Sequence, residues 1–249
     1  MATPAQTASP RKRHALDLFA SLPNAYDRMG AVLSFGQDPR WRRAMLDAVN
    51  PRPGVRILDV ATGTGLVAFG LAGRGARVTG LDQSEAMLAG ARRRLAAAPP
   101  QIQDNVTFIQ GEAEHLPFPD QEFDALTFTY LLRYVDDRAA TMRELARVLK
   151  PGGRIGMVEF GVPRAALLRA AWRLHTRVGL PLLGRAVSPA WVEVGRFLGP
   201  SIEELHAREP DLSTLWRGAG IEPVHQRPMS FGAGLVMWGV RGRDGQRAA

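Results

Sequence analysis

The stretch that decides the fold is Ile57-Leu-Asp-Val-Ala-Thr-Gly-Thr-Gly65, followed by Val78-Thr-Gly-Leu-Asp82. In the first segment, an apolar run ends at Asp59 and leads into a turn of small residues. The second segment is another apolar run, and it ends in the acid Asp82. Together they predict a strand–turn–helix–strand unit that holds an adenine nucleoside. The glycines let backbone N–H groups approach the ligand, and Asp82 can accept hydrogen bonds from both ribose hydroxyls.

Beyond this unit, runs that predict strands alternate with runs that predict helices. We expect strands at 55–60, 77–82, 105–110, 123–129 and 154–160. Helices are expected at 64–73, 84–97, 138–149 and 211–219. Two last strands, at 221–229 and 233–241, are joined by a short turn. This order predicts an α/β fold with a doubly wound, mostly parallel sheet of seven strands that ends in an antiparallel hairpin.

Helix ends are indicated by capping residues. Ser84 is a suitable N-cap for the helix that follows it, and Asp38 with Pro39 suits the start of an earlier helix. The turn Lys150-Pro-Gly-Gly153 is expected to end the helix at 138–149.

The chain is expected to form one domain over residues 1–249. Its predicted parts are a disordered basic tail (1–13), N-terminal helices (15–50), a ligand-binding core (51–160 and 211–242) and a helical lid inserted at 161–210. The lid segment has no strand pattern and is rich in Arg, Leu, Pro and Trp.

Composition excludes several classes of site. The chain has no cysteine, so disulfides, thiolate nucleophiles and cysteine metal sites are excluded. The five histidines show no ligand spacing, so no metal is expected. No secretory signal or membrane-spanning apolar run is present, so a cytoplasmic location is expected. The net charge of +8 leaves an RNA-binding or RNA-modifying protein as a distant alternative, but the basic clusters are short and lack interleaved aromatics, and no nucleic-acid partner is expected.

The glycine turn leaves two cofactors open. Residues 63–68 also satisfy a G-x-G-x-x-A dinucleotide pattern, which is a weak signal alone. Three features favour a single nucleoside over NAD. No Tyr-x-x-x-Lys pair is present, a helical segment precedes the first strand, and the loop at 111–118 can present Glu112 and the Ala113 backbone to an adenine edge.

Several segments together resemble one family. They are Ala25–Trp41 (AYDRMGAVLSFGQDPRW), Leu58–Gly65, 111–119, Arg147-Val-Leu-Lys-Pro-Gly-Gly-Arg154 with Val158-Glu-Phe160, and Phe197-Leu-Gly-Pro-Ser-Ile202. The chain resembles a class I S-adenosylmethionine-dependent methyltransferase and, more narrowly, the ubiquinone/menaquinone biosynthesis methyltransferases. That family C-methylates the ring of prenylated quinol precursors, and the segment at 26–41 is the discriminating one.

The resemblance implies a cofactor, S-adenosyl-L-methionine, and a set of residues that contact it. Thr64, Asp82, Glu112, Ala113 and Thr129 fall on the family's cofactor-contact positions. Neighbouring residues of the turn and of the second strand complete the candidate set: Asp59, Ala61, Gly63, Gly65 and Gln83. Asp59 suits a cationic amino group, and a turn-capping acid is the alternative interpretation.

Three residues are candidates for catalysis. Arg133 falls on the arginine of the family's Leu-Arg-Asn-Val segment, where a guanidinium would stabilise a phenolate. Tyr134 replaces the asparagine of that segment, and it suits either catalysis or packing. His175 lies in an amphipathic segment, 164–177, and is a candidate base; a plain cover helix is the alternative. For Arg133, the alternative is an exposed surface cation on the loop after the predicted strand at 123–129.

The leading hypothesis is a C-methyltransferase acting on a lipid-tailed quinol with a demethylmenaquinol-like ring. The arginines of the 164–177 segment would let the lid touch an anionic membrane at the inner face. Gly30 and Asp38 depart from the family's asparagine and histidine, so a C- or O-methyltransferase of secondary metabolism remains the alternative. The sequence does not determine the oligomeric state.

Overall fold

The computed structural model describes residues 34–185 and 189–243. The predicted tail at 1–13 and the part of the predicted N-terminal helices before residue 34, with Tyr26 and Gly30, lie outside the described residues.

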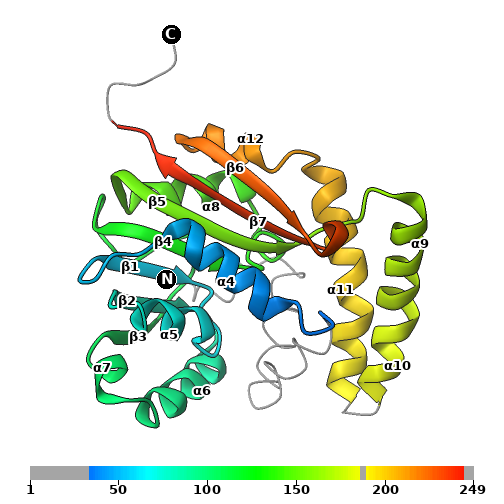
Figure 1. Cartoon of the computed structure of the whole chain (residues 1–249), viewed down its shortest axis with the longest axis horizontal. Helices are drawn as coiled ribbons and strands as arrows, with labels where there is room; N and C mark the ends of the chain where they lie inside the picture. Colours follow the sequence, from blue (N-terminus) through cyan, green and yellow to red (C-terminus); the bar gives the residue numbers. More distant parts are fainter. Residues whose placement is uncertain (1–33, 186–188, 244–249) are drawn as a thin grey trace, which may run out of the picture.

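The centre of the fold is a seven-stranded sheet of order β3-β2-β1-β4-β5-β7-β6 (Figure 1). The strands are β1 (Arg56–Val60), β2 (Arg77–Asp82), β3 (Val106–Gln110), β4 (Phe123–Thr129), β5 (Leu149–Phe160), β6 (Ile221–Met229) and β7 (Gly234–Arg241). The first five strands pair in parallel, and β7 pairs antiparallel with β5 and β6. The predicted fold class is confirmed.

Helices cover both faces of the sheet, because the central strands are apolar on both sides. On one face, α4 (Asp38–Val49) and α5 (Leu66–Ala72) share a core that includes Trp41, Met45 and Leu71. On the other face, α8 (Arg138–Arg147) and α12 (Ser213–Gly218) share a core that includes Leu145 and Trp216. The helix α6 (Glu85–Ala96) packs near β2 and β3, and the short helix α7 (Pro100–Gln103) packs against α5 and α6.

The segment after β5 forms a separate helical stack beside the sheet (Figure 1). It contains α9 (Ala166–Leu174), a π-helical turn η1 (His175–Gly179), α10 (Leu180–Arg185) and α11 (Pro189–Arg208). A small core of Trp172, Leu180, Leu198 and Ile202 joins these helices. The stack lies on the side where β5 ends. Its helical character was predicted, whereas its role as a lid stays a prediction.

Two predicted helix ends are wrong. The first helix after β4 ends at Arg147, not at the Lys150 turn, because Leu149 already pairs with Phe123 and begins β5. Asp38 does not cap α4: the Ser34 hydroxyl accepts from the Asp38 N–H (3.0 Å), and the Asp38 carboxylate turns into the interior. Ser84 does cap α6, through a hydrogen bond from the Met87 N–H.

Candidate functional site

A cavity that is partly open to solvent lies at the carboxyl ends of β1, β2 and β4. Ligands bind at this edge in open α/β sheets. The described residues that line it are Arg42, Ala61, Thr62, Gly63, Thr64, Leu66, Leu81, Asp82, Gln83, Ser84, Met87, Gly111, Ala113, Glu114, Thr129, Tyr130, Leu131, Tyr134 and Val135. We call the part built by the glycine turn, Asp82 and the loop after β3 the glycine end. The part built by Arg42, Tyr130 and Tyr134 is the aromatic end.

The glycine end begins with a turn that only small residues can form. Ala61, Gly63 and Gly65 all have left-handed backbone, with φ of 54°, 57° and 85°. A Cβ on Gly65 would also stand 2.8 Å from the Phe69 ring. The turn leads directly into the N-terminus of α5, where backbone N–H groups favour an anionic group. Of the predicted turn residues, Ala61, Gly63 and Thr64 line the cavity, and Gly65 shapes the turn behind them.

Asp82 is fixed at the end of β2 by two backbone donors. Its Oδ2 accepts from the Gly63 N–H (2.8 Å), and its Oδ1 accepts from the Ser84 N–H (2.9 Å). Burial raises the pKa of Asp82, and these backbone hydrogen bonds oppose the rise. Each carboxylate oxygen keeps a second lone pair, so the group can still accept hydrogen bonds from a ligand diol. Asp82 therefore connects the end of β2 to the glycine turn after β1, and these are the two parts of the predicted nucleoside site.

Asp59 lies behind the turn and is almost fully buried. Its two oxygens accept from the hydroxyls of Thr62 (2.6 Å) and Thr127 (2.7 Å). Burial raises the pKa of Asp59 to about 6, against the opposing effect of those hydroxyls. It is not among the described lining residues. The structure thus gives Asp59 a place in the wall that supports the turn, and its predicted contact with a ligand amino group stays a prediction.

The loop after β3 contributes Gly111, Ala113 and Glu114 to the cavity. The backbone of Glu112 pairs with that of His115 in an isolated antiparallel β-bridge. Glu112 is not among the described lining residues.

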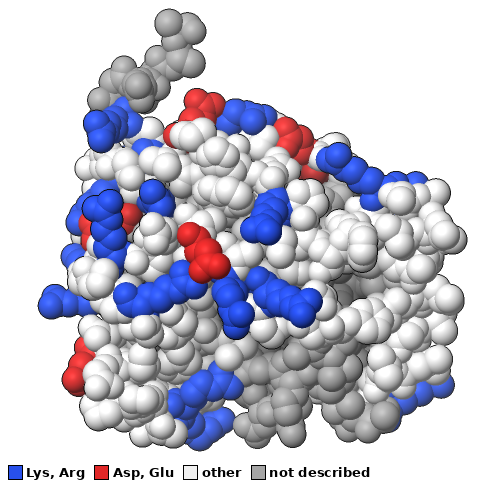
Figure 2. Space-filling model, in the orientation of Figure 1, with Lys and Arg blue, Asp and Glu red and all other residues white. Residues whose placement is uncertain are grey.

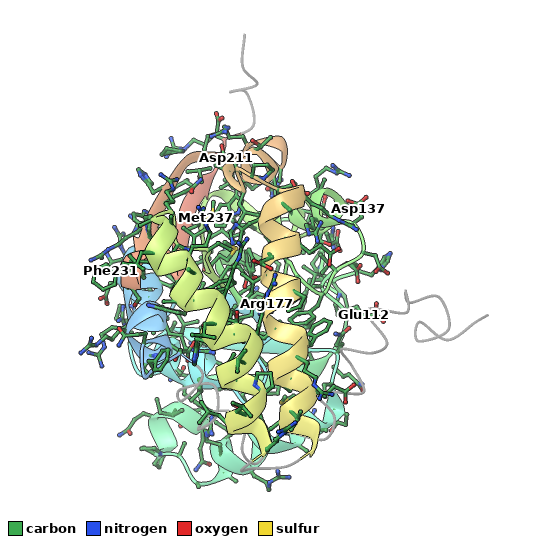
Figure 3. All side chains as sticks on the ribbon, turned by 90° about the vertical axis from the view of Figure 1, so that its right-hand side faces the viewer. Glu112, Asp137, Arg177, Asp211, Phe231 and Met237 are labelled. Atoms are coloured by element: carbon green, nitrogen blue, oxygen red, sulfur yellow. The ribbon has the colours of Figure 1, made fainter. Side chains whose placement is uncertain are left out.

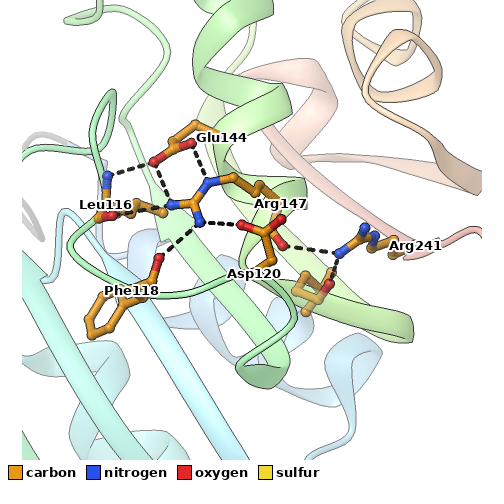
Figure 4. Close-up of polar contacts among 7 residues, drawn as sticks. Leu116, Phe118, Asp120, Glu144, Arg147 and Arg241 are labelled. Atoms are coloured by element: carbon orange, nitrogen blue, oxygen red, sulfur yellow. Dashed lines mark hydrogen bonds and ion pairs between the residues drawn. The ribbon is translucent and has the colours of Figure 1, made fainter.

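This loop is held by one arginine (Figure 4). Arg147, at the end of α8, donates to the backbone carbonyls of Leu116 and Phe118 and to Asp120 and Glu144. Glu144 also accepts from the Leu116 N–H (2.7 Å), and the arginine lowers the pKa of this glutamate. Arg147 therefore fixes the part of the loop that follows the cavity residues.

The aromatic end joins side chains from distant segments. Thr129 is the last residue of β4, Tyr130 and Tyr134 follow this strand, and Arg42 reaches the cavity from α4. Tyr134 stacks on Phe197 of α11, with ring centroids 6.0 Å apart. No described residue from 161–208 lines the cavity itself, so the helical stack meets the site only through such wall residues.

Arg133 is buried, with its side chain only 1% exposed, and it is not a described lining residue. Its Nε donates to Glu159 (2.9 Å), and its Nη1 donates to Ser201 of α11 (3.1 Å). Its guanidinium lies over the rings of Tyr134 and Tyr130, at 4.9 and 5.8 Å. The surface alternative is therefore wrong, and its predicted contact with a phenolate stays a prediction.

His175 lies outside the described cavity lining. It opens the π-helical turn η1, and its ring contacts Phe35 with centroids 4.2 Å apart. Its predicted role as a base stays a prediction.

Sequence reasoning missed Arg42 and Tyr130. Tyr130 could have been suspected, because it directly follows a predicted strand at the ligand-binding edge. Nothing near Arg42 in the sequence signals its place, since it reaches the cavity only because α4 packs against β5 and β7.

Two findings concern other kinds of site. Within residues 34–185 and 189–243, no group of three or more His, Asp or Glu side chains is placed to hold a metal ion. None of the helices formed by these residues combines the length and apolar character needed to cross a bilayer.

Comparisons with known proteins agree with this geometry. A profile of the ubiE/COQ5 methyltransferase family matches residues 7–241. The chain is 40% identical to a demethylmenaquinone methyltransferase of Clavibacter sepedonicus, covering 90% of this chain and 89% of that protein. It is 37% identical to a ubiquinone/menaquinone biosynthesis C-methyltransferase of Desulfotalea psychrophila, with coverage of 90% and 89%.

Solved structures share the fold. A SAM-dependent methyltransferase from Thermotoga maritima superposes with a TM-score of 0.57 at 23% identity, covering 90% of this chain and 99% of that chain. A phosphoethanolamine N-methyltransferase from Haemonchus contortus, in complex with S-adenosyl-L-methionine, gives 0.57 at 16% identity, with coverage of 82% and 53%.

Proposed function

Because this chain belongs to the ubiE/COQ5 methyltransferase family, we propose that it moves a methyl group from S-adenosyl-L-methionine to a ring carbon of a prenylated quinol precursor. A demethylmenaquinol-like ring is the first candidate, since the relatives named above act in menaquinone and ubiquinone biosynthesis.

The observation that carries the proposal is a single cavity with two different ends. The glycine end offers backbone N–H groups and a buried carboxylate, which suit the polar parts of S-adenosyl-L-methionine. The aromatic end offers rings and a guanidinium, which suit a flat phenolic ring.

At the glycine end, each residue has a defined task. Asp82 would accept from the ribose hydroxyls, and the turn at Gly63 and Thr64 would donate to the carboxylate of the methionine part. Gln83, Ala113 and Thr129 would contact the remaining nucleoside, and Asp59 would act behind the turn on the cationic amino group. When bound, the cofactor supplies an activated methyl on a cationic sulfur, so the protein has mainly to align the partners and exclude water.

At the aromatic end, Tyr134 would face the quinol ring. Arg133 would influence the quinol ring indirectly. Its guanidinium contacts the two tyrosine rings and forms an ion pair with Glu159. The second oxygen of Glu159 is buried without a hydrogen-bond partner, which marks this pair as an unusual, charge-bearing element of the wall.

A lipid-tailed substrate needs access from a membrane, and the helical stack offers a suitable surface. Six large apolar side chains of α9, η1 and α10 are exposed: Leu167, Leu168, Leu174, Val178, Leu182 and Leu183. We call them the α9–α10 surface. On the face drawn in Figure 2, this region is largely uncharged, with basic side chains above and below it. Apolar side chains bordered by arginines suit an anionic bilayer surface.

Two arginines near this surface also brace the stack. Arg173 and Arg177 both bind Glu203 of α11, each at 2.6 Å. Figure 3 shows Arg177 where α9 and α11 face each other.

The function is tested by labelling. Purified protein is incubated with methyl-labelled S-adenosyl-L-methionine and, separately, with reduced membrane lipid extract, soluble metabolites and total RNA. We expect label only in the lipid extract, on a quinol whose ring gains one C-methyl group. Label in the soluble fraction, or on an oxygen atom, would favour the secondary-metabolism alternative instead.

The membrane surface is tested by vesicle co-sedimentation. We expect Leu167→Asp, at a side chain 82% exposed, to weaken binding to anionic vesicles at least about tenfold, because it replaces apolar burial with a repelled charge. Gln101→Asp, an equal charge change on α7, should bind as the unmodified protein does. Equal binding of all three proteins, or no binding to anionic vesicles, contradicts a docking role.

A further inference from the structure

Tyr130 has a strained backbone at the cavity wall. Its φ is +57°, a left-handed value that a large side chain rarely adopts. In the neighbouring strand, Ala61 also follows the strand end with a left-handed φ, and both residues line the cavity. The hydrogen bond from the Tyr130 N–H to the Val158 carbonyl (2.9 Å) holds this conformation. Strain of this kind persists where surrounding structure enforces it, and it concentrates at active sites.

The Tyr130 side chain is fixed just as firmly. Its ring stacks on Phe160, with centroids 4.6 Å apart. Its hydroxyl donates to Oδ1 of Asp38, and Oδ2 of Asp38 accepts from Nε of Arg42 at 2.7 Å. Asp38 is buried, whereas Arg42 reaches the cavity wall. A phenol, a carboxylate and a guanidinium therefore form one chain, whose two ends, Tyr130 and Arg42, both line the cavity and whose middle member, Asp38, is buried.

This chain can move a proton. Burial, together with the negative charge of Asp38, raises the pKa of Tyr130 well above its usual range, so the phenol keeps its proton and is not a resident base. A phenol that donates to a carboxylate can still accept a hydrogen bond from another hydroxyl. It can then pass its own proton on while it takes the next one.

We propose that Tyr130 is a catalytic residue that takes the proton of the substrate's ring hydroxyl and passes its own proton to Asp38. The inference rests on the proposed function. The O–H bond of the substrate breaks, a new O–H bond forms at Tyr130, and the former Tyr130 proton forms an O–H bond with Asp38. The substrate becomes a phenolate, whose ring carbon is nucleophilic, and Asp38 becomes neutral.

The rest of the reaction returns the proton. Bound S-adenosyl-L-methionine would supply a methyl cation equivalent to the phenolate carbon, and the ring would become a neutral ketone. The ring carbon then loses its proton to water, while the proton held by Asp38 returns through Tyr130 to the ring oxygen. The net change is one methyl gained and one proton released to solvent.

The charges around Tyr130 favour the step. The described charged groups that face it are Asp38 and Arg42 of α4, Arg133 after β4 and Glu159 of β5. When Asp38 takes the proton, one of the two negative charges disappears while both guanidinium groups remain. The cluster then becomes net positive at the moment when the substrate oxygen becomes negative.

The test uses two short-chain demethylated naphthoquinols as substrate probes, one of them carrying a ring fluorine that makes its hydroxyl more acidic. Tyr130→Phe keeps the ring stack and removes the hydroxyl. We expect its kcat with the plain probe to fall at least about 100-fold, the scale of general acid–base catalysis, with most of the rate recovered on the fluorinated probe. Affinity for S-adenosylhomocysteine should stay within about threefold, as expected if only the proton step is lost.

Asp38→Asn is the second variant, and it should show the same loss and the same recovery on the fluorinated probe. Asp124→Asn is the matched control, since Asp124 lies at the opposite end of β4 and binds Lys150. An equal loss on both probes, or a variant as active as the unmodified protein, overturns the relay. If the unmodified protein binds S-adenosylhomocysteine but methylates neither probe, the proposed function fails and the relay fails with it.

Discussion

The glycine end and the aromatic end share one cavity but are built in opposite ways. At the glycine end, short stretches of chain place backbone N–H groups, and Asp82 accepts from Gly63 only 19 residues away. At the aromatic end, long-range contacts place side chains: Tyr130 reaches Asp38 across 92 residues, and Arg133, which lies behind the ring of Tyr134, reaches Ser201 across 68.

The difference suggests a division of tasks. A site for one fixed cofactor can rely on backbone geometry, which tolerates few changes in sequence. A site for a variable substrate can rely on side chains, which substitutions can alter without disturbing the sheet. Four predictions test whether the two ends are as separate as this comparison suggests.

The largest effect on binding is expected at Asp82. Asp82→Asn should lower the affinity for S-adenosylhomocysteine about 100-fold, because charge-assisted hydrogen bonds contribute about 1.5–3 kcal/mol each and the amide would face the backbone donors of Gly63 and Ser84. Titration calorimetry measures the change. Asp104→Asn, on an exposed side chain, is the control and should bind normally. A loss below threefold would mean that Asp82 only supports the turn.

The second prediction concerns the contribution of Asp59 to the pH dependence of the free energy of unfolding. The folded pKa of about 6 lies above the ordinary value of 3.8, so the folded state binds more protons than the unfolded state between these values. The free energy of unfolding should therefore fall as pH rises from about 4 to 6, by up to about 3 kcal/mol from this group. Urea unfolding at several pH values measures the slope.

Two variants isolate that slope. Asp59→Asn should remove it and leave the protein more stable at pH 7, at the expense of the charge proposed to face the ligand's amino group. Asp124 is the contrasting control: Lys150 and Arg56 lower its pKa, so its contribution should be present at neutral pH and fade as pH falls. An unchanged slope in Asp59→Asn would show that the buried carboxyl does not titrate near 6.

A smaller effect is expected at Arg147, which does not line the cavity but holds the loop after β3. Arg147→Lys keeps the charge but loses the fork that holds the loop, so affinity for S-adenosylhomocysteine should fall about fivefold, or about 1 kcal/mol. The melting temperature should fall with it. Arg143→Lys, exposed on the same helix, should change neither quantity. Unchanged affinity would place the loop outside the site.

The smallest effect is expected at Tyr134. Tyr134→Leu removes its stack on Phe197, worth about 1 kcal/mol, and should raise the KM for the quinol about threefold to tenfold. Phe197→Leu should produce the same change from the α11 side. Affinity for S-adenosylhomocysteine should remain within about twofold in both variants, by kinetics and calorimetry. A parallel loss of cofactor affinity would show that the two ends are coupled.

Much of the glycine end could be predicted because its signals are local. Strand ends, left-handed glycines and an acid after the second strand lie within about 25 residues of one another, and parallel strands bring their carboxyl ends to one edge. The Lys150 turn shows the limit of local signals: a Pro-Gly-Gly sequence predicts the helix end, but pairing of Leu149 with Phe123 decides it earlier.

The aromatic end could be predicted only in part. The sequence pointed to Arg133 and Tyr134 but not to their surroundings, because a buried guanidinium between Glu159, Ser201 and two tyrosines depends on which strands and helices meet. For the same reason the Asp38 side chain was expected to cap a helix, whereas its carboxylate accepts hydrogen bonds from Tyr130 and Arg42.

The sequence by itself determined the strands, the class of sheet and the turn that faces the ligand, since these follow from hydrophobic period and from the backbone freedom of small residues. Only the tertiary structure decided which charged side chains share the interior with Tyr130. Removing a charge from water is unfavourable unless an opposite charge or a hydrogen-bond partner is present in the interior. Packing between distant segments determines whether such a partner is there.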